Sequence, residues 1–119
     1  MKNRIIKKVW GYEELIVNRE YCGKKLVLKK GFRCSIHHHK IKDETFYIIK
    51  GKVLIELNNK KQILVPGDSV LIKPGEKHRF TGLEYSEIIE FSTHHKDSDS
   101  YRDSESGPVD LKQGAGNEK

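Results

Sequence analysis

Turn residues divide this chain into apolar-rich runs that are too short for helices of ordinary length. No segment carries the 3.6-residue period of a long amphipathic helix. Short strands between regularly spaced turn signals are typical of an all-β sandwich or barrel. The turn signals are Glu20–Gly23, Lys30-Gly31, Lys50-Gly51, Asn58-Asn59-Lys60, Pro66-Gly67, Pro74-Gly75 and Gly82. The runs between them predict strands at Glu14–Val17, Lys25–Lys29, Arg33–His39, Thr45–Ile49, Lys52–Leu57, Gln62–Val65, Ser69–Ile72, His78–Thr81 and Ser86–Ser92.

Length and composition indicate one globular domain. The chain has 119 residues, of which 35% are hydrophobic and 34% charged, which is enough for a core under a heavily charged surface. No apolar run approaches the roughly 20 residues of a membrane span, and residues 1–8 lack the apolar stretch of a signal peptide. Cys22 and Cys34 form no disulfide framework, and we expect reduced thiols in a cytoplasmic protein.

Positive charge is concentrated in the first part of the chain. The net charge is +6, and residues 1–42 hold twelve Lys or Arg against three Glu. One interpretation is a solvated basic face, and another is attraction of an anionic small molecule such as a sugar phosphate. We expect no nucleic-acid partner, because no basic stripe with interleaved aromatic residues is present.

Four residues have the chemistry and spacing of a metal site: His37, His39, Glu44 and His78. His37 and His39 project from the same face of a strand, because side chains alternate with a period of two. Imidazole nitrogens with a carboxylate suit a divalent first-row transition metal, and four ligands leave open positions for catalysis. His38 faces the other way, and we expect His94 and His95 on the surface.

The motif around these residues resembles that of the cupin superfamily. Gly31, His37, His39, Glu44 and Gly51 fit the pattern G-x5-H-x-H-x4-E-x6-G at every fixed position. A second segment, from Gly67 through Pro74 and Gly75 to His78, fits G-x5-P-x-G-x2-H except for Lys73 at the first proline. The resemblance implies a small cupin-type β-barrel (a double-stranded β-helix or jelly roll) over residues 1–95. It also implies a homodimer paired through edge strands and one divalent Zn, Mn, Fe, Co or Ni ion.

Other segments resemble particular cupins. Trp10-Gly11-Tyr12-Glu13, the strand after Cys22 and the stretch from Pro74 to Arg79 resemble the cupin domain of type II mannose-6-phosphate isomerases, although that family tends to carry glutamine at the position of His37. The stretch from Lys42 to Tyr47 resembles small cupins of sugar-nucleotide and nonulosonic-acid pathways. These resemblances imply a metal-dependent aldose–ketose isomerase acting on a sugar or sugar phosphate, with the metal polarising the substrate carbonyl.

Several residues are candidates for the chemistry around the metal. Alternation places Ile88, Glu90 and Ser92 on one face of the last strand, so that Glu90 is a candidate general base in the barrel; a solvent-facing or salt-bridged carboxylate is the alternative. Arg33 shares a face with His37 and would pair with a substrate phosphate or carboxylate. Lysines Lys40, Lys42 and Lys77 would recruit a phosphate at the rim, or else be surface charges.

The sequence also admits two other functions, and two arrangements of the C-terminal segment. The same ligands suit an iron-dependent dioxygenase, which an apolar pocket would favour, whereas a polar, anion-binding pocket favours the isomerase. A non-catalytic sugar- or metal-binding protein would bind its ligand without turnover. Residues 96–119 form a polar C-terminal segment, with residues 112–119 expected to be disordered. It is either a simple tail or packs over the barrel mouth or a partner subunit through Val109 and Leu111.

Overall fold

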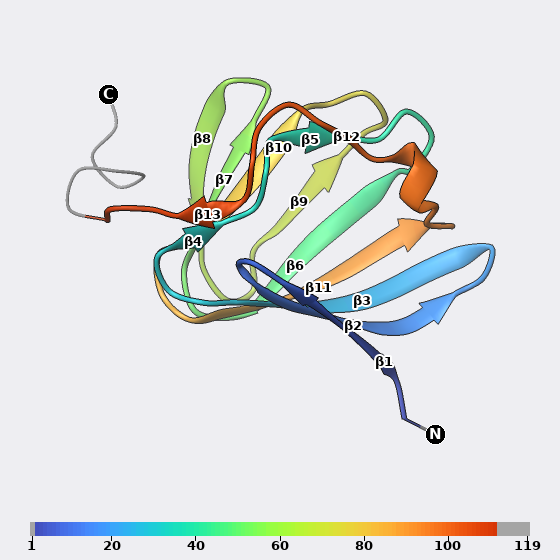
Figure 1. Cartoon of the computed structure of the whole chain (residues 1–119), viewed down its shortest axis with the longest axis horizontal. Helices are drawn as coiled ribbons and strands as arrows, with labels where there is room; N and C mark the ends of the chain where they lie inside the picture. The colour runs from blue at the N-terminus through green and yellow to red at the C-terminus, as the bar shows by residue number, and fades with distance from the viewer. Residues whose placement is uncertain (1, 112–119) are drawn as a thin grey trace.

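The protein is built from two antiparallel β-sheets that face each other across one core (Figure 1). The computed structural model describes residues 2–111, and the strands in this range alternate between the two sheets along much of the chain. One short 3-10 helix, η1 (Asp97–Asp99), is the only helix in the described part. The all-β fold class predicted from the turn spacing is confirmed.

The six-stranded sheet contains the first three strands of the chain and the strand that carries Glu90. Its order is β1-β2-β3-β11-β6-β9. The strands are β1 (Arg4–Lys8), β2 (Gly11–Asn18), β3 (Tyr21–Leu28), β11 (Ser86–Thr93), β6 (Glu44–Lys50) and β9 (Ser69–Ile72).

The seven-stranded sheet carries the histidines. Five strands follow the order β12-β5-β10-β4-β13, and β7 pairs with β10 and β8. The strands are β12 (Tyr101–Arg102), β5 (His37–His38), β10 (His78–Gly82), β4 (Phe32–Arg33), β13 (Gly107–Pro108), β7 (Val53–Leu57) and β8 (Lys60–Leu64).

Side-chain alternation fills the space between the sheets as the sequence pattern predicts. In β6, Phe46 and Ile48 are buried beside Glu44, whereas Tyr47 and Ile49 are exposed. Each fully buried aliphatic or aromatic side chain contributes about 1.5–3 kcal/mol to folding. The core cluster consists of Trp10, Leu26, Leu28, Cys34, Phe46, Ile48, Val53, Ile55, Leu64, Ile72, Phe80 and Ile88.

The first two strands differ from the prediction. The predicted strand Glu14–Val17 is the middle of the longer β2, and β1 before it was not predicted. Arg4–Lys8 has two adjacent isoleucines between basic residues, so it lacks the apolar–polar alternation that marks a strand. β1 nevertheless forms because it pairs along its whole length with β2.

The predicted continuous strand Arg33–His39 is wrong. The chain forms β4 and β5 separately, and the backbone between them bonds to other partners. The amides of Ser35 and Ile36 donate to the hydroxyls of Ser106 and Ser104 at 3.1 and 2.7 Å. Side chains of the C-terminal segment therefore replace ladder hydrogen bonds here, which sequence alternation cannot foresee.

Two turns show why their residues are needed. Asn58 and Asn59 have φ values of 51° and 68° and connect β7 to β8, which confirms the tight hairpin predicted from residues that tolerate positive φ. Gly51 has φ 92°, and a Cβ there would overlap the Ser86 hydroxyl and the Tyr85 carbonyl. Only glycine satisfies both the conformation and the space.

The segment after β11 packs onto the barrel. β12 pairs with β5, and β13 pairs with β4, so residues 97–108 run along the open edge of the seven-stranded sheet (Figure 1). The amide of Val109 also donates to the Gly31 carbonyl at 2.7 Å. Of the two alternatives for this segment, the structure shows packing on the barrel. The disorder expected for residues 112–119 lies outside the described residues.

Across residues 2–111, the structure has no helix that is long and apolar enough to cross a membrane.

Candidate metal centre

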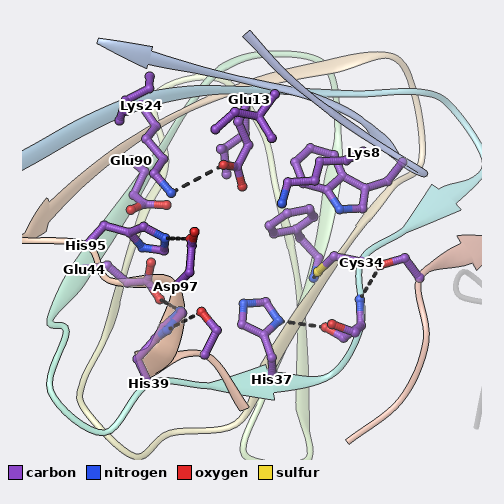
Figure 2. A pocket seen from close by; sticks show the side chains of 18 of the residues that line it. Lys8, Glu13, Lys24, Cys34, His37, His39, Glu44, Glu90, His95 and Asp97 are labelled. Carbon is purple, nitrogen blue, oxygen red and sulfur yellow. Dashed lines mark hydrogen bonds and ion pairs between the residues drawn. The ribbon is translucent and has the colours of Figure 1, made fainter. Parts of the chain in front are cut away.

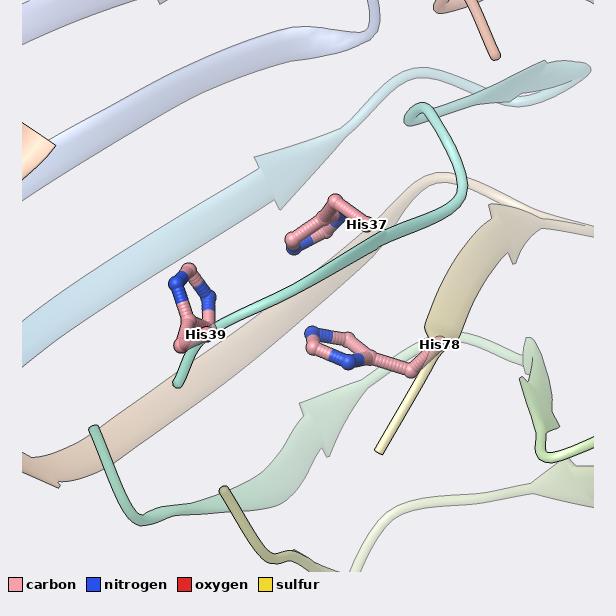
Figure 3. Close-up of side chains that lie close together, drawn as sticks. All are labelled: His37, His39 and His78. Atoms are coloured by element: carbon pink, nitrogen blue, oxygen red, sulfur yellow. The ribbon is translucent and has the colours of Figure 1, made fainter. Parts of the chain in front are cut away.

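Three histidines from two neighbouring strands converge on one point (Figure 3). His37 and His78 are directly opposite each other in the β5–β10 pair, and His39 follows immediately after β5. One nitrogen from each ring can be chosen so that all three lie within 4.8 Å of one another. His39 and His78 are buried, and His37 is half-buried. The spacing of the motif therefore produces a real cluster of potential ligands.

The hydrogen bonds of the three rings fix which nitrogen is free. In each ring Nδ1 lies within hydrogen-bond distance of a backbone carbonyl: Ser35 for His37 at 2.8 Å, Asp99 for His39 at 3.0 Å and Glu76 for His78 at 3.0 Å. A carbonyl can only accept, so Nδ1 carries the hydrogen. In a neutral ring the lone pair is then on Nε2, the arrangement that backbone carbonyls impose on metal-binding histidines.

Glu44, the first residue of β6, completes the cluster. Its Oε2 is 3.2 Å from Nε2 of His78 and 3.4 Å from Nε2 of His39. Both Oε2 of Glu44 and Nε2 of His78 are buried without a hydrogen-bond partner in the structure. Lone pairs that face one another in a buried site are costly, and a cation between them removes the cost. The four residues thus fit a divalent metal.

The protonation states agree with this interpretation. Burial, with the nearby His78 ring, lowers the pKa of His37 to about 3, and burial with the Lys42 charge lowers the pKa of His39 to about 4. Burial alone would raise the pKa of Glu44, but the adjacent His78 ring and the Lys42 ammonium lower it to about 2. At neutral pH the site offers two neutral imidazoles and a carboxylate, the forms that bind metals.

The lowered imidazole pKa values predict how the metal-free protein responds to acid. His37 and His39 ionise near pH 6.5 when unfolded but only near pH 3 and 4 when folded, so the unfolded state binds more protons between these limits. We expect constant stability above about pH 6.5 and a loss below it, at up to about 1.4 kcal/mol per pH unit for each proton. Urea unfolding of the metal-free protein from pH 8 to pH 4 measures this. His37→Gln should reduce the slope, and an unchanged slope would contradict the assignment.

Asp99, in the C-terminal segment, orients the loop that carries His39. Its carboxylate accepts hydrogen bonds from the amides of Lys40, Ile41 and Lys42 at 2.9–3.2 Å, and its carbonyl holds Nδ1 of His39. Burial would raise the pKa of Asp99, but these amides lower it, so the residue is a carboxylate. Sequence reasoning missed Asp99, because it lies in a polar stretch without motif or periodicity.

Removing the Asp99 carboxylate should weaken metal binding. We expect Asp99→Ala to reduce metal affinity about 10–100-fold, the usual effect of losing a group that orients a ligand, because the loop around His39 loses its anchor. Competition with a chromogenic chelator measures the affinity. Asp103→Ala is the matched control, since Asp103 is exposed and pairs with Lys77. Equal metal affinities of the Asp99→Ala and Asp103→Ala variants would contradict this role for Asp99.

A buried ion pair lies next to the candidate metal ligands. Nζ of Lys42 is 3.1 Å from Oε2 of Glu90 and 3.4 Å from Oε1 of Glu44, and the Ser92 hydroxyl donates to Glu90 at 2.9 Å. Burial would lower the pKa of Lys42, but Glu90 and Glu44 raise it. Glu90 therefore points into the barrel as alternation predicts. The expected position of Lys42 at the rim is wrong, because its ammonium is drawn inward between two carboxylates.

His95 was expected on the surface, and this is wrong. It is half-buried and lines the cavity. Nζ of Lys42 donates to its Nδ1 at 3.1 Å, and its Nε2 donates to Asp97 at 2.9 Å. Burial, with the charges of Lys24 and Lys42, lowers its pKa. His94 is exposed as predicted. No sequence signal separates these two adjacent histidines, because they follow the last predicted strand.

A cavity of about 560 Å³ opens onto the candidate metal ligands His37, His39 and Glu44. This volume is ordinary for small-molecule sites. Figure 2 shows His37 and His39 on one side of it and Lys8, Glu13 and Lys24 on the other. Glu44, Lys42 and Glu90 line the cavity, and most of the other lining residues are polar or charged as well. His78 does not line it.

Three residues predicted to bind substrate are absent from the cavity wall. Arg33 is the last residue of β4 and does not line the cavity. Nζ of Lys40 lies 4.5 Å from the centroid of the Tyr101 ring. Lys77 is exposed and forms an ion pair with Asp103 at 2.9 Å. The cations that do line the cavity come from β1, β3, the Lys42 loop and β12.

Comparisons with known proteins agree with this geometry. The family model for the cupin domain (Cupin_2) matches residues 25–91. A curated relative, the uncharacterized protein YdbB of Bacillus subtilis, is 32% identical over 65 residues, which cover 54% of this chain and 56% of that protein. The chain thus matches little more than half the length of this relative.

Solved structures share the fold at low identity. PAC13 of Streptomyces with uridine has a TM-score of 0.78 at 11% identity, covering 95% of this chain and 91% of PAC13. KdgF of Halomonas sp. has a TM-score of 0.69 at 21% identity, with 73% and 81% covered. Oxalate decarboxylase of Bacillus subtilis has a TM-score of 0.76 at 16% identity, with 84% and 30% covered.

Proposed function

Because the chain belongs to the cupin domain family, we propose that it is a metal-dependent enzyme that interconverts the aldose and ketose forms of a sugar or sugar phosphate. His37, His39, Glu44 and His78 would hold one divalent ion of zinc, manganese, iron, cobalt or nickel. When bound, this ion supplies Lewis-acid polarisation of the substrate carbonyl and its neighbouring hydroxyl. The observation that carries the proposal is a buried carboxylate, Glu90, beside that cluster in a polar cavity.

Glu90 has the position of a general base. It would take the proton from C2 of the aldose and return it to C1, while the hydroxyl proton passes from O2 to O1. Substrate and product are then isomers, and no redox partner is required. Lys42 and Ser92 hold the carboxylate in place at 3.1 and 2.9 Å, which supports proton transfer from one fixed position.

The character of the cavity favours the isomerase over the dioxygenase. An oxygenase with an apolar substrate would need an apolar pocket, whereas this wall carries six Lys or Arg and four Asp or Glu residues. The fold does not choose by itself, since one structural neighbour was solved with uridine and another is an oxalate decarboxylase.

Isomerisation is tested by exchange with solvent. The metal-loaded protein is incubated in D₂O with hexoses and hexose 6-phosphates, and ¹H NMR follows deuterium incorporation at C1 and C2. We expect exchange and a ketose product with at least one substrate. Oxygen consumption without exchange would replace the proposal with the dioxygenase. Ligand binding without either reaction would replace it with a non-catalytic binding protein.

We also propose the homodimer expected for a small cupin. β1 and β9 are the outer strands of the six-stranded sheet, and their residues Ile5 and Leu71 are 52% and 49% exposed. Edge strands with exposed apolar side chains are suited to pairing with a second copy, which supports the proposal.

A further inference from the structure

We infer that Lys8 and Arg102 bind an anionic group of the substrate, a carboxylate or a phosphate, in the cavity that opens onto the metal cluster. The inference deepens the proposed function, because it names the charge class of the substrate and the residues that select it. It rests on that function for the identity of the site, but the binding it describes can be measured without turnover.

The cavity wall carries more positive than negative charge. Six cationic and four anionic side chains line it, which leaves a net formal charge of +2 when the histidines are neutral. Glu13 lies 3.4 Å from Lys24 and Glu90 3.1 Å from Lys42. Asp97 lies 2.9 Å from His95, and the hydrogen bond from His95, with the charges of Lys24 and Lys8, lowers the pKa of Asp97. Glu44 contacts the histidines and Lys42. The acids therefore leave part of the positive charge uncompensated.

In the part of the chain that the structure describes, the cavity cations without an ion pair lie on β1 and β12. Among the described residues, no ion pair involves Arg4, Lys7, Lys8 or Arg102, although all four line the cavity. Arg4 and Lys7 are exposed, as is Arg102 on β12, and water screens an exposed charge. Lys8 is half-buried, and Figure 2 shows its side chain directed into the cavity. Of the three on β1, Lys8 is thus the one placed to contact a bound molecule.

Arg102 lines the cavity from β12. β12 pairs with β5, so that Arg102 lies opposite His37 and Tyr101 opposite His38. The Tyr101 ring stacks on the His38 ring, 5.1 Å between centroids, on the side away from the metal cluster. Because neighbouring strand residues face opposite sides, Arg102 shares the cavity side with His37. A guanidinium there can bind a carboxylate or phosphate with two hydrogen bonds.

Lys8 is the last residue of β1 and is held in place by the turn that follows it. The chain turns directly after it at Trp10-Gly11, where Trp10 is buried and packs edge-on against Phe80 at 5.1 Å. Gly11 has φ 151°, and a Cβ there would overlap the Val27 carbonyl. The tryptophan anchor and the close approach that only glycine allows fix the β1–β2 hairpin over the cavity. The Trp-Gly pair noted in the sequence therefore places Lys8.

With a neutral sugar bound, neither Lys8 nor Arg102 would form a direct ion pair, whereas an anionic group would pair with both. The chemistry admits two sources, the carboxylate of a sugar acid and the phosphate of a sugar phosphate. Arg33, Lys40 and Lys77, which the sequence suggested for this task, do not line the cavity.

The test compares neutral and anionic forms of the same sugars. Isothermal titration calorimetry of the metal-loaded full chain measures binding of glucose, mannose and galactose, their 6-phosphates and their uronic acids, at low ionic strength. We expect at least one phosphate or uronate to bind about tenfold or more tightly than its neutral sugar. The series that binds distinguishes the phosphate from the carboxylate source. Equal affinity of neutral and anionic forms in every series would overturn the inference.

Variants assign the preference to the two residues. Lys8→Gln and Arg102→Gln should each lower the affinity for the anion about tenfold or more while leaving metal content unchanged. Arg102→Lys should keep part of the preference, which separates loss of charge from misfolding. Lys30→Gln is the control, because Lys30 is exposed and away from the cavity. An anion preference that survives both glutamine variants would overturn the inference.

The binding result and the reaction are separate outcomes. Anion binding that depends on Lys8 and Arg102, without isomerisation, supports this inference and contradicts the isomerase. Isomerisation of a neutral sugar, with no anion preference, supports the isomerase and contradicts this inference.

Discussion

We expect alanine in place of His39 to abolish tight metal binding while the protein stays folded. The substitution removes one of four converging ligands, so the loss should exceed the about 10–100-fold effect of removing a residue that only orients a ligand. The cost in the free energy of unfolding of the metal-free protein should be about 1–3 kcal/mol, as for other buried substitutions. Elemental mass spectrometry and urea unfolding measure the two quantities.

His38→Ala is the matched control for this variant. His38 is adjacent in sequence, but its ring stacks on Tyr101 rather than facing the cluster. It should keep its metal. Full metal retention in His39→Ala would remove His39 from the ligand set, whatever its effect on stability.

We expect glutamine in place of Glu90 to remove the proposed isomerisation while the protein keeps its metal. The amide keeps the size of the carboxylate and can still accept from Ser92, but it cannot take a proton from carbon. Since general-base catalysis contributes about 10²–10⁴-fold, we expect a loss of that order in kcat with metal content unchanged. The D₂O exchange assay measures kcat for the substrate that it identifies.

Glu87→Gln tests whether this effect is specific. Glu87 is on the same strand but on the opposite face, where it pairs with Lys25 at 3.3 Å. Its replacement should leave turnover unchanged. Equal turnover in Glu90→Gln and the unmodified protein would exclude Glu90 as the base.

The sequence predicts those parts of the site that lie on regular strands. Alternation places Glu44 and Glu90 inward on β6 and β11, and the two-residue spacing of His37 and His39 puts both rings on one side. These predictions succeed because a strand fixes side-chain direction by parity alone. The glycines of the motif mark turns for the same local reason.

Residues that the sequence did not predict depend on contacts between distant segments. Asp99 reaches the loop at Lys40–Lys42, and Arg102 reaches the wall beside His37, only because the C-terminal segment pairs with β5. The burial of Lys42 depends on Glu90, far along the chain. Composition marks this segment as polar, but it carries no period that indicates where it will pack.

The central claim is that His37, His39, Glu44 and His78 bind one transition metal, and metal content tests it most directly. Elemental mass spectrometry measures the metal content of the protein purified without a tag and of the His78→Ala variant. Each is measured after reconstitution with zinc, manganese, iron, cobalt and nickel. The predicted result is about one equivalent of one metal in the unmodified protein and none in the variant. No bound metal in either protein, or equal metal in both, would contradict the account.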